Sequence, residues 1–249
     1  MSNKFENKDF WNQADVIKSQ DREINPKLYS YEKILLDKLP LRLTDKLRIQ
    51  IIGCGTGRET FEIYHKFPNS QIVASDISEK MIEKFNQNLH FWKLDTNRLI
   101  LKCCSAENLD EPSNSSDLVT VFTSTLTYVF PSEMRNNFLK NLYRILKPGG
   151  FIIGVVHHRY GRLTKSMYFI LQYLYAWIFK ITPGDRIGGF YNKKLKTHYF
   201  TKQEIKDLLI INNFEPILVS DLYNLFKMEG KKYNRWKGDN NIVFIAKKR

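Results

Sequence analysis

The sequence has few cysteines, no Cys or His pair with the spacing of a metal site and no long apolar run. Only three of its 249 residues are cysteines, and two of them, Cys103 and Cys104, are adjacent, so a disulfide framework is excluded. No paired Cys or His has the spacing of a metal site, and we expect no bound metal. No apolar run reaches the roughly 18 residues of a membrane-spanning helix. Residues 1–6 are polar and mixed in charge, unlike a secretory signal, so we expect a cytoplasmic protein with reduced thiols.

Glycine is scarce as well, yet three of the twelve glycines stand together in a G-x-G-x-G turn. Gly53, Gly55 and Gly57 follow a short apolar stretch, predicted as a strand over 47–52, and precede a predicted helix over 58–67. Glycine permits positive φ and lets a ligand approach the main chain closely. Strand, glycine turn and helix in this order are typical of an α/β sheet that binds a nucleotide-like ligand.

A carboxylate follows at the distance that such a sheet requires. The second apolar run, 71–75, ends in Asp76, nineteen residues after Gly57. An acid at the tip of the second strand accepts hydrogen bonds from ribose hydroxyls. The alternative is a helix N-cap for the predicted helix 78–89, and the two roles are compatible. A dinucleotide site would need a small residue after the turn, and Arg58 argues against it.

Further motifs follow in a fixed order. They are Ile-Ile-Gly-Cys-Gly-Thr-Gly over 51–57, Asp-Ile-Ser-Glu-Lys-Met-Ile over 76–82, Ser-Ala-Glu-Asn-Leu over 105–109, Asp-Leu-Val over 117–119 and Leu-Lys-Pro-Gly-Gly over 146–150. In these motifs, which cover roughly residues 45–156, the chain resembles the class I S-adenosylmethionine-dependent methyltransferases. The resemblance implies a doubly wound, Rossmann-like α/β sheet of seven strands in the order 3-2-1-4-5-7-6, with the last strand antiparallel. It also implies methyl transfer from S-adenosylmethionine to oxygen, nitrogen or carbon.

The same resemblance assigns the residues that bind the cofactor. They are Gly53, Cys54, Gly55, Gly57, Asp76, Ile77, Met81, Ser105, Ala106, Glu107 and Thr123. Two positions depart from the family pattern. Ser105 stands where the family usually has an Asp that holds the adenine amino group, and Ile51 stands where it most often has an acid beneath the glycine turn. A neutral hydroxyl holds an amino group more weakly than a carboxylate does, so we expect modest cofactor affinity.

We expect one methyltransferase domain over residues 1–249, made of four parts. Residues 1–44 form an N-terminal cap, helical over 5–40, whose aromatic residues either pack or touch the ligand. Residues 45–156 form the cofactor-binding core, and 201–249 complete the sheet with a helix that begins at a Thr201–Glu204 capping box. Between them, 157–200 interrupt the family pattern after strand five.

This inserted region contains fourteen consecutive uncharged residues, 166–179, between two lysines. The segment is too short to span a membrane and too apolar for an ordinary surface helix. We expect a lid helix over an acceptor pocket. The alternative is a helix lying in a membrane surface, with the lysines at its rim. The glycine-containing stretch 183–189 is expected to be a mobile loop.

Positive charge is concentrated in the last third of the chain. Residues 157–249 carry eighteen Lys and Arg against seven Asp and Glu, whereas 51–156 carry eleven of each. This distribution favours an anionic partner or a membrane surface, although a lysine-rich surface also serves solubility. The aromatic and basic connector 222–240 is expected to be a solvated loop.

We expect the acceptor to be a small, largely apolar or aromatic molecule, a class that includes lipid-like molecules, because the inserted region is rich in apolar and aromatic residues. One alternative is RNA, supported by the basic last third but not by any recognisable RNA-binding appendage. Another is a regulatory protein that binds the cofactor without catalysis.

The predicted catalytic residues lie at the carboxyl ends of strands four and five. They are Tyr128 together with His157 or His158, one of which would orient the acceptor or exchange a proton with it. Successive residues of a strand face opposite ways, so at most one histidine should look into the pocket. We favour His157. The alternative is a histidine that only hydrogen-bonds the backbone.

Overall fold

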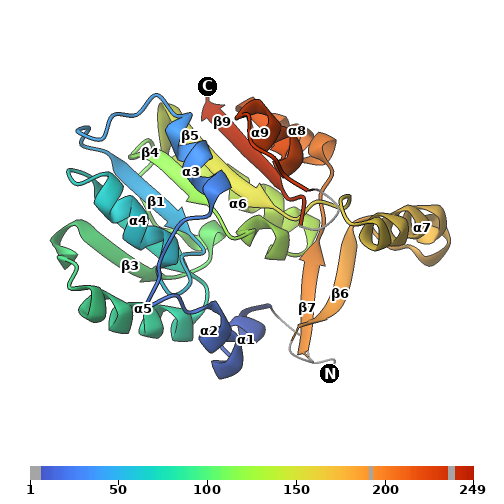
Figure 1. Ribbon diagram of the computed structural model, residues 1–249, viewed down its shortest axis with the longest axis horizontal. Coiled ribbons are helices and arrows are strands. Elements are labelled where there is room, and N and C mark those ends of the chain that lie inside the picture. The colour runs from blue at the N-terminus through green and yellow to red at the C-terminus, as the bar shows by residue number, and fades with distance from the viewer. Residues whose placement is uncertain (1–6, 191–192, 235–238) are drawn as a thin grey trace.

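The computed structural model describes residues 7–190, 193–234 and 239–249, and its centre is a seven-stranded sheet in the order β3-β2-β1-β4-β5-β9-β8 (Figure 1). The strands are β1 Arg48–Ile52, β2 Gln71–Asp76, β3 Leu99–Cys103, β4 Ser116–Val121, β5 Leu146–Val156, β8 Phe214–Asp221 and β9 Ile242–Lys248. The first five pair in parallel, and β9 is antiparallel to both β5 and β8. The predicted strand order and the antiparallel last strand are confirmed.

Helices on both faces of the sheet bury its apolar side chains. They include α4 Arg58–Lys66, α5 Glu79–Trp92, α6 Ser132–Ile145 and α8 Lys202–Ile211. The central strands are buried on both faces because helices cover both, so Ile49, Ile51 and Val119 are fully inaccessible. The predicted capping box of α8 is present, since Glu204 N donates to Thr201 Oγ1 at 3.1 Å and Thr201 N donates to Glu204 Oε2 at 2.7 Å.

The expected helical segment over 5–40 is helical only in parts. The described part of this segment contains three short helices, α1 Asn7–Trp11, α2 Ala14–Gln20 and α3 Ser30–Asp37. Residues 21–29 do not form a helix, and Pro26 disfavours helical geometry in the residue before it. The backbone there is tied to α5, because Trp92 Nε1 donates to the carbonyl of Glu23 at 2.7 Å.

The expected mobile loop at 183–189 is also wrong. Strands β6 Asp185–Phe190 and β7 Lys193–His198 form an antiparallel hairpin. The hairpin is fastened to α1, because Asn7 Nδ2 donates to the carbonyl of Lys196 at 2.8 Å and Lys196 N donates to Asn7 Oδ1 at 3.0 Å. Leu195 packs in a small core with Phe10, which is fully buried. Long-range contacts that the local sequence does not signal therefore order this segment.

Part of the predicted solvated connector is a helix. Helix α9 spans Leu222–Met228 and begins at Asp221, whose Oδ1 accepts from Asn224 N at 2.9 Å. Leu225 is fully buried in the core. The basic and aromatic residues 235–237 of this connector lie outside the described residues.

Helix α7, Leu163–Phe179, is present as predicted but lies at one end of the molecule (Figure 1). Figure 1 shows it beyond the hairpin and away from the seven-stranded sheet. In the part of the chain that the structure describes, no helix is long and apolar enough to cross a membrane.

Candidate cofactor and acceptor site

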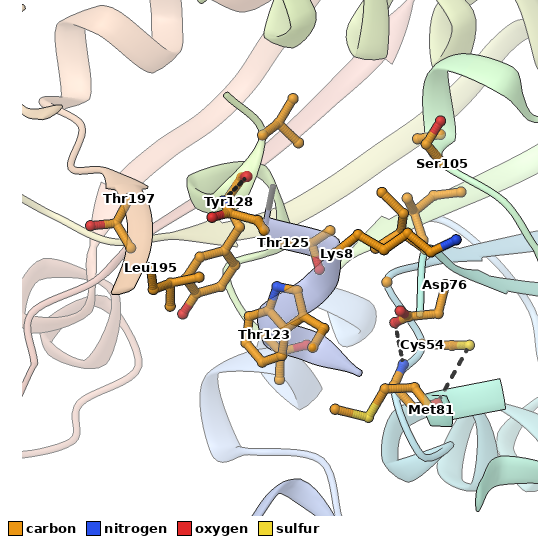
Figure 2. Close-up of a pocket in the computed structure, with 18 of the residues that line it drawn as sticks. Lys8, Cys54, Asp76, Met81, Ser105, Thr123, Thr125, Tyr128, Leu195 and Thr197 are labelled. Atoms are coloured by element: carbon orange, nitrogen blue, oxygen red, sulfur yellow. Dashed lines mark hydrogen bonds between the residues drawn. The ribbon is translucent and has the colours of Figure 1, made fainter. Parts of the chain in front are cut away.

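A cavity of about 840 Å³ opens at the carboxyl ends of β1, β2 and β4. Ligands of open α/β sheets bind at this edge. The glycine turn, the tip of β2 and the η2 turn, Ala106–Asn108, line one part of it. The η3 turn, Thr125–Tyr128, the hairpin and α1 line the other. Figure 2 shows Asp76 and Cys54 on one side of the cavity, and Tyr128, Leu195 and Thr197 opposite them.

The glycine turn has two crowded positions and one open position. A Cβ built on Gly53 would lie 2.3 Å from Thr125 Oγ1, and one on Gly57 would lie 2.2 Å from the ring of Phe85. A Cβ on Gly55 would meet no atom within 4 Å. All three glycines have positive φ, which side-chain-bearing residues rarely adopt. Gly55 therefore leaves free space where a ligand can approach the main chain, and this space fits the expected cofactor.

Asp76, the last residue of β2, holds the glycine turn through its carboxylate. Its Oδ2 accepts from Gly55 N at 2.9 Å (Figure 2). Its Oδ1 accepts from Ser78 N at 2.9 Å. Burial raises the pKa of this carboxyl, whereas the donated N–H groups lower it. The N-cap alternative is wrong, because the N-cap of α5 is Ser78, whose hydroxyl accepts from Met81 N at 3.1 Å. A carboxylate has about four acceptor positions, so Asp76 keeps capacity for ribose hydroxyls.

The other predicted cofactor residues surround the same part of the cavity. Cys54, Ile77, Met81, Ser105, Ala106, Glu107 and Thr123 all line it. Thr123 and Ser124 have φ of 52° and 62°, left-handed values that non-glycine residues adopt at a cost. This backbone turns the chain sharply where β4 ends, and it brings Thr125 against the glycine turn.

Aromatic rings form the opposite part of the cavity. The ring centroids of Trp11 and Tyr128 are 5.0 Å apart, those of Tyr128 and His157 are 5.7 Å apart, and those of His157 and Tyr199 are 5.3 Å apart. Burial raises the pKa of Tyr128, so its hydroxyl keeps its proton at neutral pH. This wall suits a planar or apolar molecule.

The two predicted histidines face different surroundings. His157 lines the cavity, and its Nδ1 is buried without a hydrogen-bond partner among the described residues. Burial, and to a lesser degree Lys165, lowers the pKa of His157 to about 4, so the ring is neutral at pH 7. His158 is not among the lining residues, and its Nδ1 lies 3.1 Å from the carbonyl of Asn240. Burial likewise lowers the pKa of His158 to about 4.

The structure corrects the expected lid and adds lining residues that the sequence did not single out. Within the described ranges, no residue of α7 lines the cavity. The hairpin lines it instead, through Arg186, Gly188, Leu195, Lys196 and Thr197. Glu59 and Arg22 also line the cavity. No local motif marks these positions, because tertiary packing brings them to the site. The described residues contain no group of three or more His, Cys, Asp or Glu that could hold a metal ion.

The sheet order, the glycine turn and the acid at the tip of β2 are those of the class I S-adenosylmethionine-dependent methyltransferase fold. Residues 49–150 match the family model of the methyltransferase domain. A solved S-adenosylmethionine-dependent methyltransferase from Methanosarcina mazei is similar in fold, with a TM-score of 0.66 and 21% identity, over 89% of this chain and 98% of that one. Binding of S-adenosylmethionine is typical of the family.

Two curated relatives match part of the chain. A carboxy-S-adenosyl-L-methionine synthase from Shewanella pealeana is 33% identical over 128 residues, which are 51% of this chain and 47% of the relative. A tRNA N(3)-methylcytidine methyltransferase from Schizosaccharomyces pombe is 33% identical over 141 residues, which are 53% of this chain and 42% of the relative. The chain thus spans less than half the length of either relative.

Proposed function

We propose that this chain transfers the methyl group of S-adenosylmethionine to a small, largely apolar or aromatic acceptor at oxygen, nitrogen or carbon. The observation that carries the proposal is one cavity in which a glycine turn and Asp76 face a wall of aromatic rings. About 840 Å³ lies within the range of sites for small ligands, so a cofactor and a small acceptor suit it better than a macromolecule does.

The proposed cofactor half of the cavity holds S-adenosylmethionine through named groups. Asp76 accepts from the ribose, the main chain at Gly55 lies against the ligand, and Ser105, Ala106 and Glu107 hold the adenine. The bound sulfonium supplies an already activated methyl group, so the main task of the protein is alignment of the acceptor with that methyl group. In this proposal residues 45–156 form the cofactor core, 1–44 cap it and 201–249 complete the sheet.

The acceptor half positions the nucleophile. Trp11, Tyr128 and Tyr199 enclose a planar or apolar acceptor, and His157 Nδ1 accepts a hydrogen bond from its N–H or O–H group. The hairpin of the inserted region 157–200 takes the place that was expected for a lid helix. A closed aromatic wall also excludes water from the nucleophile.

Replacement of Asp76 by alanine is expected to weaken S-adenosylmethionine binding by about 1.5–3 kcal/mol, the range for losing hydrogen bonds to a charged group. Titration calorimetry measures the affinity, and thermal unfolding checks that the variant is folded. Asp110→Ala removes an exposed carboxylate that does not line the cavity, so this control should bind as the wild type does. Unchanged affinity of Asp76→Ala would remove Asp76 from the site.

RNA is the second candidate acceptor. The +11 charge of residues 157–249 favours it, and the matched tRNA methyltransferase is a relative of this kind. An RNA acceptor would insert one base into the cavity, since the cavity is too small for more.

Incorporation of label from methyl-labelled S-adenosylmethionine into a cell extract tests these assignments. The extract is separated into lipid, small-molecule, RNA and protein pools. Label in the lipid or small-molecule pool supports the proposal, and label in RNA supports the second candidate. If the protein binds S-adenosylmethionine but labels no pool, the non-catalytic regulatory alternative stands.

A further inference from the structure

Helix α7 exposes large apolar side chains over most of its circumference. Trp177 is 89% exposed, and Leu174 is 70% exposed. Further exposed apolar residues of this helix are Leu163, Met167, Tyr168, Ile170, Leu171, Tyr173, Ile178 and Phe179. A contiguous apolar surface of this kind on a folded protein marks a site of interaction.

The helix is fixed to the body by one narrow stripe, Phe169, Gln172 and Ala176, which is buried. Gln172 Nε2 donates to the carbonyl of Asp185 at 2.7 Å, and Gly184 N donates to Gln172 Oε1 at 2.9 Å. Phe169 packs on Tyr199, with ring centroids 4.9 Å apart. The orientation of α7 is therefore set by hydrogen bonds and packing, and its apolar face is directed outward.

The segment that contains the helix is strongly basic, although Lys165 pairs with Asp239 and Arg159 pairs with Glu204. Residues 157–200 carry eight Lys and Arg and a single acid, Asp185, which is hydrogen-bonded to His198. Lys180 caps the carboxyl end of α7 and is exposed, as are Arg186 and Lys194. An apolar helix with tyrosine and tryptophan side chains and flanking cations is complementary to a lipid surface that carries negative charge.

We propose that α7 docks this protein on an anionic membrane surface by inserting its exposed apolar face among the lipids. Seventeen residues at about 1.5 Å each are too short to span a bilayer, so the helix lies in the surface. A second copy of the chain fits less well. Two packed α7 helices would bring their lysines together, and the helix has no acid that could pair with them. A second α7 would also cover only one side of the helix and would leave its other exposed apolar side chains in water.

Co-sedimentation with vesicles tests the docking surface. The full chain is mixed with phosphatidylcholine vesicles and with vesicles that also contain phosphatidylglycerol. We expect firm binding to the anionic vesicles, weaker binding to the neutral ones, and loss of binding as salt rises. Leu174→Lys should weaken partition into anionic vesicles by about ten- to a hundredfold, because an apolar side chain no longer enters the lipid.

Ile211→Lys is the matched control, because Ile211 is also 70% exposed and lies on another helix, α8. Both substitutions add one positive charge, so a purely electrostatic attachment would be unaffected or strengthened in both. Equal loss in the two variants, equal binding to neutral vesicles or no binding by the wild type would overturn the proposal. Sedimentation velocity without lipid gives a further test. A wild-type dimer that Leu174→Lys converts to a monomer would make α7 a protein interface and also overturn it.

A different observation concerns Glu59, the second residue of α4. Its side chain is only 2% exposed, it lines the cavity, and neither carboxylate oxygen has a hydrogen-bond partner among the described residues. Arg58 Nη2 lies 3.9 Å from Glu59 Oε2. The guanidinium of Arg58, however, donates two hydrogen bonds to the Glu32 carboxylate, from Nη1 at 2.7 Å and from Nη2 at 2.8 Å. Burial raises the pKa of Glu59. A buried carboxylate without partners is costly unless a ligand supplies a cation or a donor.

We infer that the Glu59 carboxylate receives the α-ammonium group of the methionine part of S-adenosylmethionine. This inference rests on the proposed function. Glu59 lies beside the glycine turn, whereas Ile51 on the preceding strand β1 is fully buried and apolar. Glu59 therefore supplies a carboxylate from the helix side of the turn, where the end of β1 supplies none.

Binding of truncated ligands tests this inference. S-adenosylhomocysteine retains the amino-acid end, whereas 5′-methylthioadenosine lacks it. By titration calorimetry, Glu59→Gln should weaken S-adenosylhomocysteine binding by about ten- to a hundredfold and leave methylthioadenosine binding within about twofold. Glu62→Gln, one turn along α4 and paired with Lys33, is the control and should bind both ligands as the wild type does.

The outcomes separate this inference from the proposed function. If the wild type binds neither ligand, the proposed function fails and the inference with it. If the wild type binds both but Glu59→Gln weakens both equally or neither, only the role of Glu59 is overturned.

Discussion

Replacement of His157 by alanine is expected to reduce turnover on the true acceptor by about 10²–10⁴-fold while leaving S-adenosylmethionine affinity unchanged. His157 lies on the aromatic side of the cavity, and its buried Nδ1 has no hydrogen-bond partner among the described residues, so an acceptor that enters the cavity can supply one. An imidazole with a low pKa is a weak base, so we expect the lower end of this range. Single-turnover rates and titration calorimetry separate the two quantities.

The pH dependence of turnover tests the role of His157 independently of the alanine variant. Burial lowers the pKa of His157 to about 4, so its neutral form, which can accept a hydrogen bond, is present at and above pH 6. Turnover should be level between about pH 6 and 8 and should fall only as the pH approaches 4. His65→Ala, an exposed histidine outside the cavity, is the control. A loss of less than a few-fold in His157→Ala would mean that alignment alone drives the reaction.

Gly57→Ala should destabilise the fold by about 2–5 kcal/mol, since it adds overpacking against Phe85 to a left-handed backbone that alanine disfavours. Gly55→Ala carries only the backbone cost, about 1–2 kcal/mol, because its methyl group would enter open cavity space. The two variants should therefore separate stability from binding. Gly57→Ala loses stability, and Gly55→Ala loses cofactor affinity while remaining folded.

Denaturant unfolding and titration calorimetry of the two glycine variants measure these effects. The comparison is internally matched, because both substitutions add one methyl group within the same turn. Equal midpoints of unfolding for the two variants would contradict the packing described around Gly57. Normal cofactor affinity in Gly55→Ala would contradict the placement of the ligand against the main chain.

The cofactor half of the fold could be predicted from sequence because its signals are local. The glycine turn, Asp76 and the Thr201–Glu204 capping box each act within a few residues, and the parallel strand order follows from the family resemblance. The alternation of strand residues between faces predicted that at most one of the two histidines would face the pocket, but it did not determine which one. In the structure, His157 lines the cavity and His158 contacts Asn240.

The acceptor half could not be predicted because distant segments build it. The hairpin β6–β7 is held by Asn7, nearly two hundred residues away in the sequence, with a separation of 189 to Lys196. The apolar composition of α7 indicated a helix but not the direction of its apolar face, which Gln172 fixes through Gly184 and Asp185. Glu59 belongs to no sequence motif, and only its buried carboxylate without hydrogen-bond partners indicates a role in ligand binding.

Titration of the purified wild-type chain with S-adenosylmethionine tests the central claim most directly, with NAD as the comparison ligand. We predict saturable binding of one S-adenosylmethionine per chain, displaced by S-adenosylhomocysteine, and no binding of NAD, because Arg58 occupies the position where a dinucleotide site needs a small residue. Binding of NAD, or no heat with S-adenosylmethionine at millimolar concentration, would contradict the assignment of the cavity.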